Sequence, residues 1–191
     1  MIISLVKAVH VGGLVMGFGG AALADYMLFT RCISRPVTQG AVNYIRFLSR
    51  IVACGLGILW ISGLMLVWLR IQAAPEFAAN PKLWAKIVIV CILTVNGIVI
   101  HNFALKRLEH SIGRRYFDGA GALETAGLML CGSISSVSWM VPFLLGMLPE
   151  LNYVAPAAHI LAVYVALIGI VWAAMPTVVH FATKPKWRSA Y

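Results

Sequence analysis

The chain has 191 residues, of which 61% are hydrophobic and only 11% are charged, and its formal net charge at pH 7 is +9. Soluble domains carry roughly 25% charged residues, so this composition excludes a soluble globular protein. The basic residues stand in short segments that connect long apolar stretches, so they indicate a solvated cytoplasmic face rather than a nucleic-acid-binding surface.

Five apolar segments follow one another along the chain, and each is long enough to cross a bilayer, which takes about 20 residues in a helix. Short connections join them, and no internal repeat or second domain is apparent. The sequence therefore predicts an all-α fold: a polytopic membrane bundle of about five transmembrane helices, with residues 1–191 as a single domain. The predicted spans are residues 3–28, 48–71, 83–106, 122–147 and 155–180.

The distribution of basic residues predicts the orientation of the bundle in the bilayer. Lys and Arg gather in the first and third connections and in the tail, whereas residues 149–153 carry none. Cytoplasmic loops are enriched in these residues. We therefore expect the N-terminus outside and the C-terminus in the cytoplasm. The residues concerned are Arg31, Arg35 and Arg46 at the first connection, Lys106, Arg107, Arg114 and Arg115 at the third, and Lys184, Lys186 and Arg188 in the tail.

The first span carries His10, and an ionisable side chain in a membrane helix is a functional-site hypothesis by default. Small residues follow His10 at spacings that return to one helix face. Such residues usually allow close packing of helices. They are also compatible with a groove for a flat macrocycle that has His10 as a ligand. The small residues are Gly13, Gly17, Ala21 and Ala24.

The fifth span repeats this arrangement, with small residues on the same face as His159. In the predicted topology His10 and His159 both lie in the outer half of the bilayer. Two imidazoles at similar depth on facing helices could bind a b-type haem through both axial positions. His180, at the other end of this span, is expected in the headgroup region.

The third span is the most polar and carries Lys86, Asn96 and His101. Lys86 lies near its outer end, where a lysine can extend to the surface. Asn96 is expected to form an interhelical hydrogen bond. Leu93, Gly97 and His101 share one broad face with Lys86, and Asn96 points elsewhere. His101 lies on the opposite side of the membrane from His10, so we expect it to serve a second cofactor or to bond to Asp25.

The fourth span contains Trp139 below the expected interface. A buried indole N–H needs a hydrogen-bond acceptor. Trp139 is accordingly expected either to bond to a neighbouring helix or to stack on a cofactor.

Three segments carry a family resemblance: "LVKAVHVGG" followed by "LADYMLFTR", then "RFLSRIVACGLGILWISGLMLVW", and "KLWAKIVIVCILTVNG". They resemble a superfamily of small bacterial membrane proteins that includes the HemJ-type protoporphyrinogen IX oxidases and the CopD copper-resistance membrane domains. The resemblance covers roughly the first 110 residues. It implies a multi-pass protein of the bacterial inner membrane that handles haem or metal.

In the HemJ type, an early histidine of the first helix and a lysine that follows a tryptophan at the start of the third helix serve haem binding and activity. His10 and Lys86 match these two residues. The third-helix histidine of that type falls about one turn earlier, where this chain has Gly97, so His101 is not matched. His159 has no counterpart there, and the resemblance implies no particular substrate.

The leading hypothesis is an integral membrane protein that binds haem b and takes part in redox chemistry. It would pass electrons from a quinol or oxidise a porphyrinogen, and as an enzyme it would be a membrane oxidoreductase. His10 and His159 would be ligands of the iron, and Lys86 would pair with a propionate or a substrate carboxylate. His101 and Trp139 are further candidate cofactor-binding residues.

Two other hypotheses stay open from the sequence. The first is a copper-handling or transport protein that uses His10, His159 and methionines as ligands, although the eight methionines form no Met-x-x-Met cluster. The second is an accessory structural subunit, in a larger membrane complex or a homo-oligomer, whose polar residues only join helices. The four cysteines form no Cys-x-x-Cys pair, which argues against a thiolate zinc site or an iron–sulfur cluster.

Overall fold

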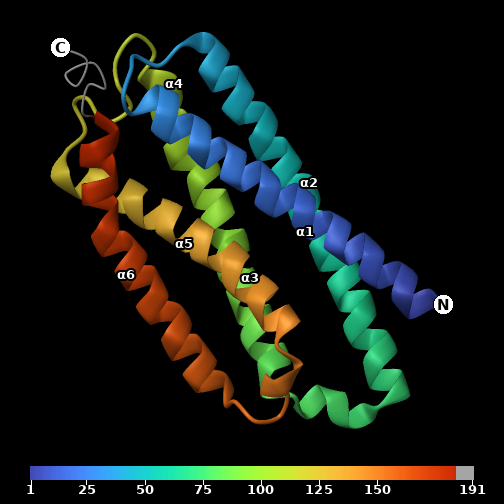
Figure 1. Cartoon of the computed structure of the whole chain (residues 1–191). Coiled ribbons are helices and arrows are strands. Elements are labelled where there is room, and N and C mark those ends of the chain that lie inside the picture. Colours follow the sequence, from blue (N-terminus) through green and yellow to red (C-terminus); the bar gives the residue numbers. More distant parts are fainter. Residues whose placement is uncertain (184–191) are drawn as a thin grey trace, which may run out of the picture.

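The computed structural model describes residues 1–183, and these residues form helices without a β-strand (Figure 1). Five helical stretches are long and apolar enough to cross a membrane, which confirms the predicted number of spans. In chain order the helices are α1 (Ile2–Met27), α2 (Gln39–Ala73), α3 (Pro81–Val99), α4 (Leu105–His110), α5 (Ala122–Met147) and α6 (Ala157–Thr183). Four short elements connect them: the π-helical turns η1 (Leu28–Cys32) and η3 (Ile100–Ala104), and the 3₁₀ turns η2 (Pro75–Ala79) and η4 (Pro149–Leu151).

The second span starts earlier than hydropathy predicts. Helix α2 begins at Gln39 rather than at residue 48, because Thr38 caps it by accepting a hydrogen bond from the Ala41 backbone N–H at 3.2 Å. Ala41 and Val42 in its first turn are buried against Cys32. The first turns of α2 contain too many polar residues for hydropathy to include them in the span, although one face of these turns is buried.

The helices form two groups that meet along a restricted line (Figure 1). Helices α1 and α2 pack closely as an antiparallel pair, and α5 packs on α3 and α6 in the other group. In the first pair, Gly13 and Gly17 of α1 lie against Gly55 of α2 at backbone distance. Helix α5 touches α1 through Trp139, whose ring packs on Gly17. Gly13 and Gly17 of the first span thus serve close packing between helices.

One end of the bundle collects both basic connections and the end of α6. The Val37 backbone N–H donates to the Arg114 carbonyl at 2.8 Å, which joins the first connection to the third. Ser34 Oγ donates to the Ala182 carbonyl at 2.6 Å. The N-terminus lies at the opposite end (Figure 1). This common end is what the distribution of basic residues predicts. The side of the membrane that this end faces stays a prediction. The three basic residues of the tail, Lys184, Lys186 and Arg188, lie outside the described residues.

Candidate functional site

A cavity of about 630 Å³ lies between α1, α2, α3 and α5, on the side of the basic connections; we call it the central cavity. Pockets that bury most of a small ligand typically measure about 300–1,000 Å³. Apolar side chains such as Leu56, Leu93 and Ile98 form much of its wall. Its polar lining consists of Asp25, Ser49, Trp60, Thr94, His101, Asn102, Tyr116, Ser135 and Trp139.

His101 lies on the π-helical turn η3, which interrupts the third span beside the central cavity. Within residues 1–183 its ring makes neither a hydrogen bond nor an ion pair, so the imidazole is available to a ligand. π-helical turns inside membrane or soluble helices occur frequently at functional sites. Leu93, Gly97 and His101 all line the cavity, as expected of residues on one helix face, whereas Lys86, the fourth residue predicted on this face, does not line it.

Asn96 of α3 points away from the cavity, as expected. Its side-chain amide donates to the Cys131 carbonyl of α5 at 2.9 Å. The predicted interhelical hydrogen bond is therefore present, and Asn96 joins helices rather than contributing to the site.

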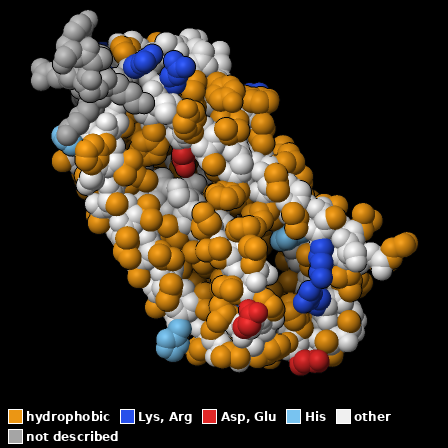
Figure 2. Space-filling view, in the orientation of Figure 1, with side chains coloured by type: hydrophobic (Ala, Val, Ile, Leu, Met, Phe, Trp, Pro, Cys, Tyr) orange, Lys and Arg blue, Asp and Glu red, His pale blue; other side chains and the backbone are white. Residues whose placement is uncertain are grey.

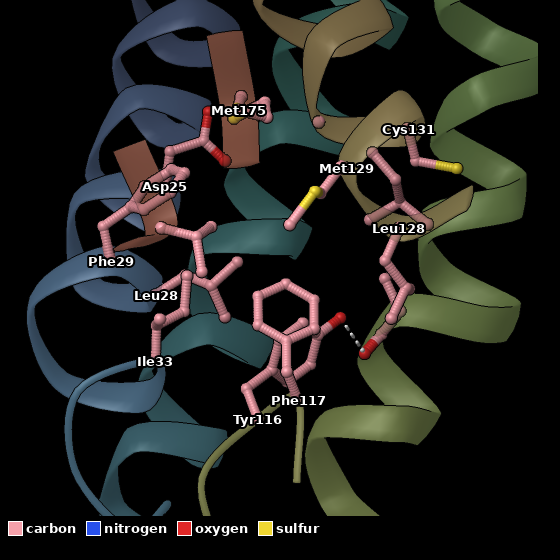
Figure 3. A pocket seen from close by; sticks show the side chains of 14 residues that line it. Asp25, Leu28, Phe29, Ile33, Tyr116, Phe117, Leu128, Met129, Cys131 and Met175 are labelled. Atoms are coloured by element: carbon pink, nitrogen blue, oxygen red, sulfur yellow. Dashed lines mark hydrogen bonds between the residues drawn. The ribbon is translucent and has the colours of Figure 1, made fainter. Parts of the chain in front are cut away.

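Asp25 lies between the central cavity and a second, smaller cavity of about 90 Å³. Its carboxylate accepts a hydrogen bond from Ser136 Oγ at 3.5 Å, and the structure contains no Asp25–His101 bond. Both residues nevertheless line the central cavity. Figure 3 shows the smaller cavity, with the Met129 sulfur pointing into it and Met175 beside the Asp25 carboxylate.

Tyr116, in the connection after α4, ties the two π-helical turns together. Its backbone N–H donates to the Cys32 carbonyl at the end of η1, at 2.9 Å. Its hydroxyl donates to the Ala104 carbonyl at the end of η3, at 3.2 Å. Burial raises the pKa of the Tyr116 phenol well above its ordinary value, so this hydroxyl stays protonated as a donor. The wall of the central cavity that carries His101 is thereby fixed to α1.

His10 lies outside the central cavity, between α1 and α2. Its Nδ1 makes a hydrogen bond with Ser62 Oγ at 2.9 Å, and Ser62 in turn donates to the Ile58 carbonyl at 2.5 Å. Gly13 and Gly17 of the small-residue face are covered by α2 and by Trp139 and leave no groove beside His10, whereas Ala21 and Ala24, further along the same face, line the central cavity. Ser62 supplies the polar partner that the depth of His10 requires.

His159 and His10 are not brought together. His159 lies exposed near the start of α6, which packs on α3 and α5 rather than on α1 (Figure 1). His180, near the other end of α6, is exposed as well. Within the described part of the chain no three His, Cys, Asp or Glu side chains form a cluster that could hold a metal ion.

Trp139 is 2% exposed and lines the central cavity, while its ring end lies against Gly17. Its Nε1 is buried and has no hydrogen-bond acceptor within residues 1–183. Buried polar groups normally have a partner. This orphaned donor therefore fits a site that is completed by a ligand.

Trp60 of α2 also lines the central cavity. Its Nε1 donates to Thr94 Oγ1 at 3.0 Å and so links α2 to α3. Sequence reasoning missed Trp60, Thr94 and Tyr116 as residues of this site. No local signal in the sequence identifies them, because each acquires its role only from a partner on a distant helix.

No family model, no curated protein and no solved structure matches this chain. The resemblance to the HemJ and CopD proteins thus depends on the segments quoted above. The two residues that carry it, His10 and Lys86, interact electrostatically with each other, but neither lines the central cavity.

Proposed function

We propose that this chain is an integral membrane protein that binds haem b in the central cavity and takes part in redox chemistry. The observation that carries the proposal is an imidazole without a hydrogen bond, His101, on a π-helical turn in the wall of a 630 Å³ cavity. The size of the cavity, its apolar wall and its imidazole fit the requirements of a haem. When bound, haem supplies one-electron chemistry.

The cavity contains one histidine, so His101 would hold the iron, and no methionine or second histidine lines the same space. His10 and His159, the ligand pair expected from the sequence, lie elsewhere. A single protein ligand would suit oxidation of a substrate better than simple electron transfer. Asp25 would accept a proton at its carboxylate, and Trp139 would donate its N–H to the bound group.

Absorption spectra of the purified chain after haem supplementation test this function. We expect a Soret band for the wild type and for the His159→Ala variant, and its loss in His101→Ala. A second variant, Gly97→Phe, would fill the cavity without a backbone clash, because nothing lies within 4 Å of a Cβ at this position. Gly127→Phe is the matched control on α5, where the space is also open.

A wild-type protein without a Soret band would refute the haem proposal. A band that survives both His101→Ala and Gly97→Phe would refute the central cavity as its location. If the host strain also kept its respiratory activity with either variant, the accessory-subunit hypothesis would be favoured.

The smaller cavity favours copper handling as a second candidate function. Met129 and Met175 thioethers and the Asp25 carboxylate surround it, and thioethers are ligands that select Cu(I) (Figure 3). Cys131 also lines this cavity, but its sulfur points away from the centre. Competition with a Cu(I) chelator should then show binding that Met129→Leu weakens and that Met140→Leu, at an exposed position on the same helix, leaves unchanged.

A further inference from the structure

A group of basic side chains lies at the end of the bundle opposite the basic connections; we call it the basic cluster. It consists of Arg70 near the end of α2, Lys82 and Lys86 in the first turns of α3, and His10 of α1. The charges of Lys82 and Arg70 act on Lys86, and that of Lys86 acts on His10. Figure 2 shows basic side chains and a histidine gathered over the gap between the α1–α2 pair and α5.

Lys86 has no anionic partner in the part of the chain that the structure describes. It is partly buried, and the charges acting on it are both positive. The two ion pairs among residues 1–183, Arg46–Glu109 and Arg107–Glu124, belong to other segments. A charge removed from water is normally paired. Glu150 acts on Lys82, the other lysine of the cluster, but no carboxylate of residues 1–183 forms an ion pair with Lys86, so Lys86 calls for an anion from outside the described chain.

The other members of the cluster are held in place by the fold. Lys82 is 6% exposed, and its Nζ donates to the Leu148 carbonyl at the end of α5, at 2.7 Å. The Arg70 guanidinium lies over the Phe77 ring at 5.2 Å. Because Lys82 and Lys86 stand at the N-terminal end of α3, the helix dipole adds positive potential there.

The depth of the cluster in the bilayer indicates which kind of molecule supplies the anion. Trp68 and Trp84 flank it, and both are strongly exposed, as expected of aromatic residues at the headgroup level of a bilayer. Below the cluster, α2 and α3 expose apolar side chains such as Leu64 and Val88 at the surface. A molecule with an anionic headgroup and a hydrocarbon chain fits both the basic cluster and the apolar surface below it.

We propose that Lys86, together with Arg70 and Lys82, binds the phosphate of an anionic phospholipid whose acyl chains lie along the exposed apolar surface of α2 and α3. This site is independent of any haem, because none of its basic residues lines the central cavity. The lipid phosphate supplies the missing counter-charge of Lys86.

Native mass spectrometry of the full chain in detergent, titrated with phosphatidylglycerol or with phosphatidylcholine of the same acyl chains, tests the proposal. We expect phosphatidylglycerol to bind more tightly, and Lys86→Met to weaken it about fivefold, as removal of one basic residue near a membrane surface should. Lys86→Arg should bind like the wild type. Lys7→Met is the matched control: Lys7 is exposed on α1 one turn before His10 and is not a member of the basic cluster.

Equal binding of the two lipids would overturn the proposal, as would equal losses in the Lys86→Met and Lys7→Met variants. Displacement of phosphatidylglycerol by millimolar inorganic phosphate would overturn the lipid assignment, because it would show that phosphate alone is recognised. Should Lys86→Met fail to fold, as judged by its circular dichroism, Arg70→Met at an exposed position replaces it with the same expectation.

Discussion

Gly55 is the residue at which the α1–α2 pair has least room. A Cβ at this position would lie 2.8 Å from the Gly13 carbonyl oxygen and 2.8 Å from the Gly17 Cα. Both neighbours are backbone atoms, so they cannot move aside without separating the helices. Gly55→Ala should therefore lower the free energy of unfolding by about 1–3 kcal/mol, the usual cost of overpacking. Unfolding in mixed detergent micelles measures it.

Gly57→Ala is the control for this substitution, because it adds the same methyl group two residues further along α2. Nothing lies within 4 Å of a Cβ there, so only the higher helix propensity of alanine acts, and we expect a change of less than about 1 kcal/mol. If both variants lost the same stability, the close approach of α1 and α2 would not contribute to it.

The histidines show how far residue-level prediction reaches. Hydropathy alone placed His10 and His101 in membrane-spanning helices, and the helix periodicity placed His101 on one face with Leu93 and Gly97. The sequence could not show that Ser62 would satisfy His10, since 52 positions separate the two residues. The candidate site therefore lies at His101 rather than at the His10–His159 pair. His10 is bonded to a partner on another helix, whereas the His101 imidazole has no such partner within residues 1–183 and can bind a ligand.

At the level of the elements, the helices were predictable and their irregularities were not. Long apolar segments specify five spans because backbone polar groups in lipid must be satisfied within the helix. The π-helical turns η1 and η3 change the hydrogen-bond register without changing composition, so the sequence carries no signal for them. Since η3 is the turn that presents His101, the most informative feature of the site was also the least predictable.

The connection after α4, which Tyr116 bonds to η1 and η3, should make the free energy of unfolding depend on pH. The raised pKa of Tyr116 means that the folded protein keeps this proton when the unfolded chain, with an ordinary tyrosine pKa near 10, has lost it. The contribution to stability is thus complete below about pH 10 and declines as the pH rises above it, by about 1.4 kcal/mol per pH unit. Tyr116→Phe should remove this part of the slope in unfolding experiments between pH 9 and 11.

Tyr44→Phe is the control, because Tyr44 is exposed and its phenol is not engaged by the fold. The wild type and the Tyr44→Phe variant should lose stability in parallel above about pH 10, where lysines titrate in every variant. If Tyr116→Phe followed the same slope as these two, burial of the Tyr116 phenol would not control the stability of the connection.

At the scale of the whole molecule, the bundle consists of two helix groups that meet in its middle at Trp139 and at the Trp60–Thr94 bond, and at one end through bonds such as Ser34–Ala182 and Arg46–Glu109. Hydropathy does not report how helices pair, since every span needs an apolar surface toward lipid in any arrangement. The separation of the two groups leaves the central cavity on one side and the basic cluster on the other. Both candidate binding sites therefore follow from packing between the groups, which the composition of single helices does not specify.

The orientation of this bundle is the remaining prediction at that scale. The end that holds both basic connections should face the cytoplasm, because Lys and Arg are retained on that side during insertion. Arg115 and Glu150 are exposed in the connections at opposite ends, so single-cysteine variants at these positions report on the two sides. The native exposed cysteines, Cys54 and Cys91, lie within spans and should be shielded by lipid from a charged reagent.

A membrane-impermeant maleimide should label Glu150→Cys in intact cells and Arg115→Cys only after the membrane is permeabilised. The labelling of the wild type gives the background from its four native cysteines. The reverse pattern would place the basic end outside, against the charge rule, and would move His101 to the outer half of the bilayer. The basic cluster would then face the cytoplasmic leaflet, so the same labelling also tells which leaflet supplies the lipid proposed for Lys86.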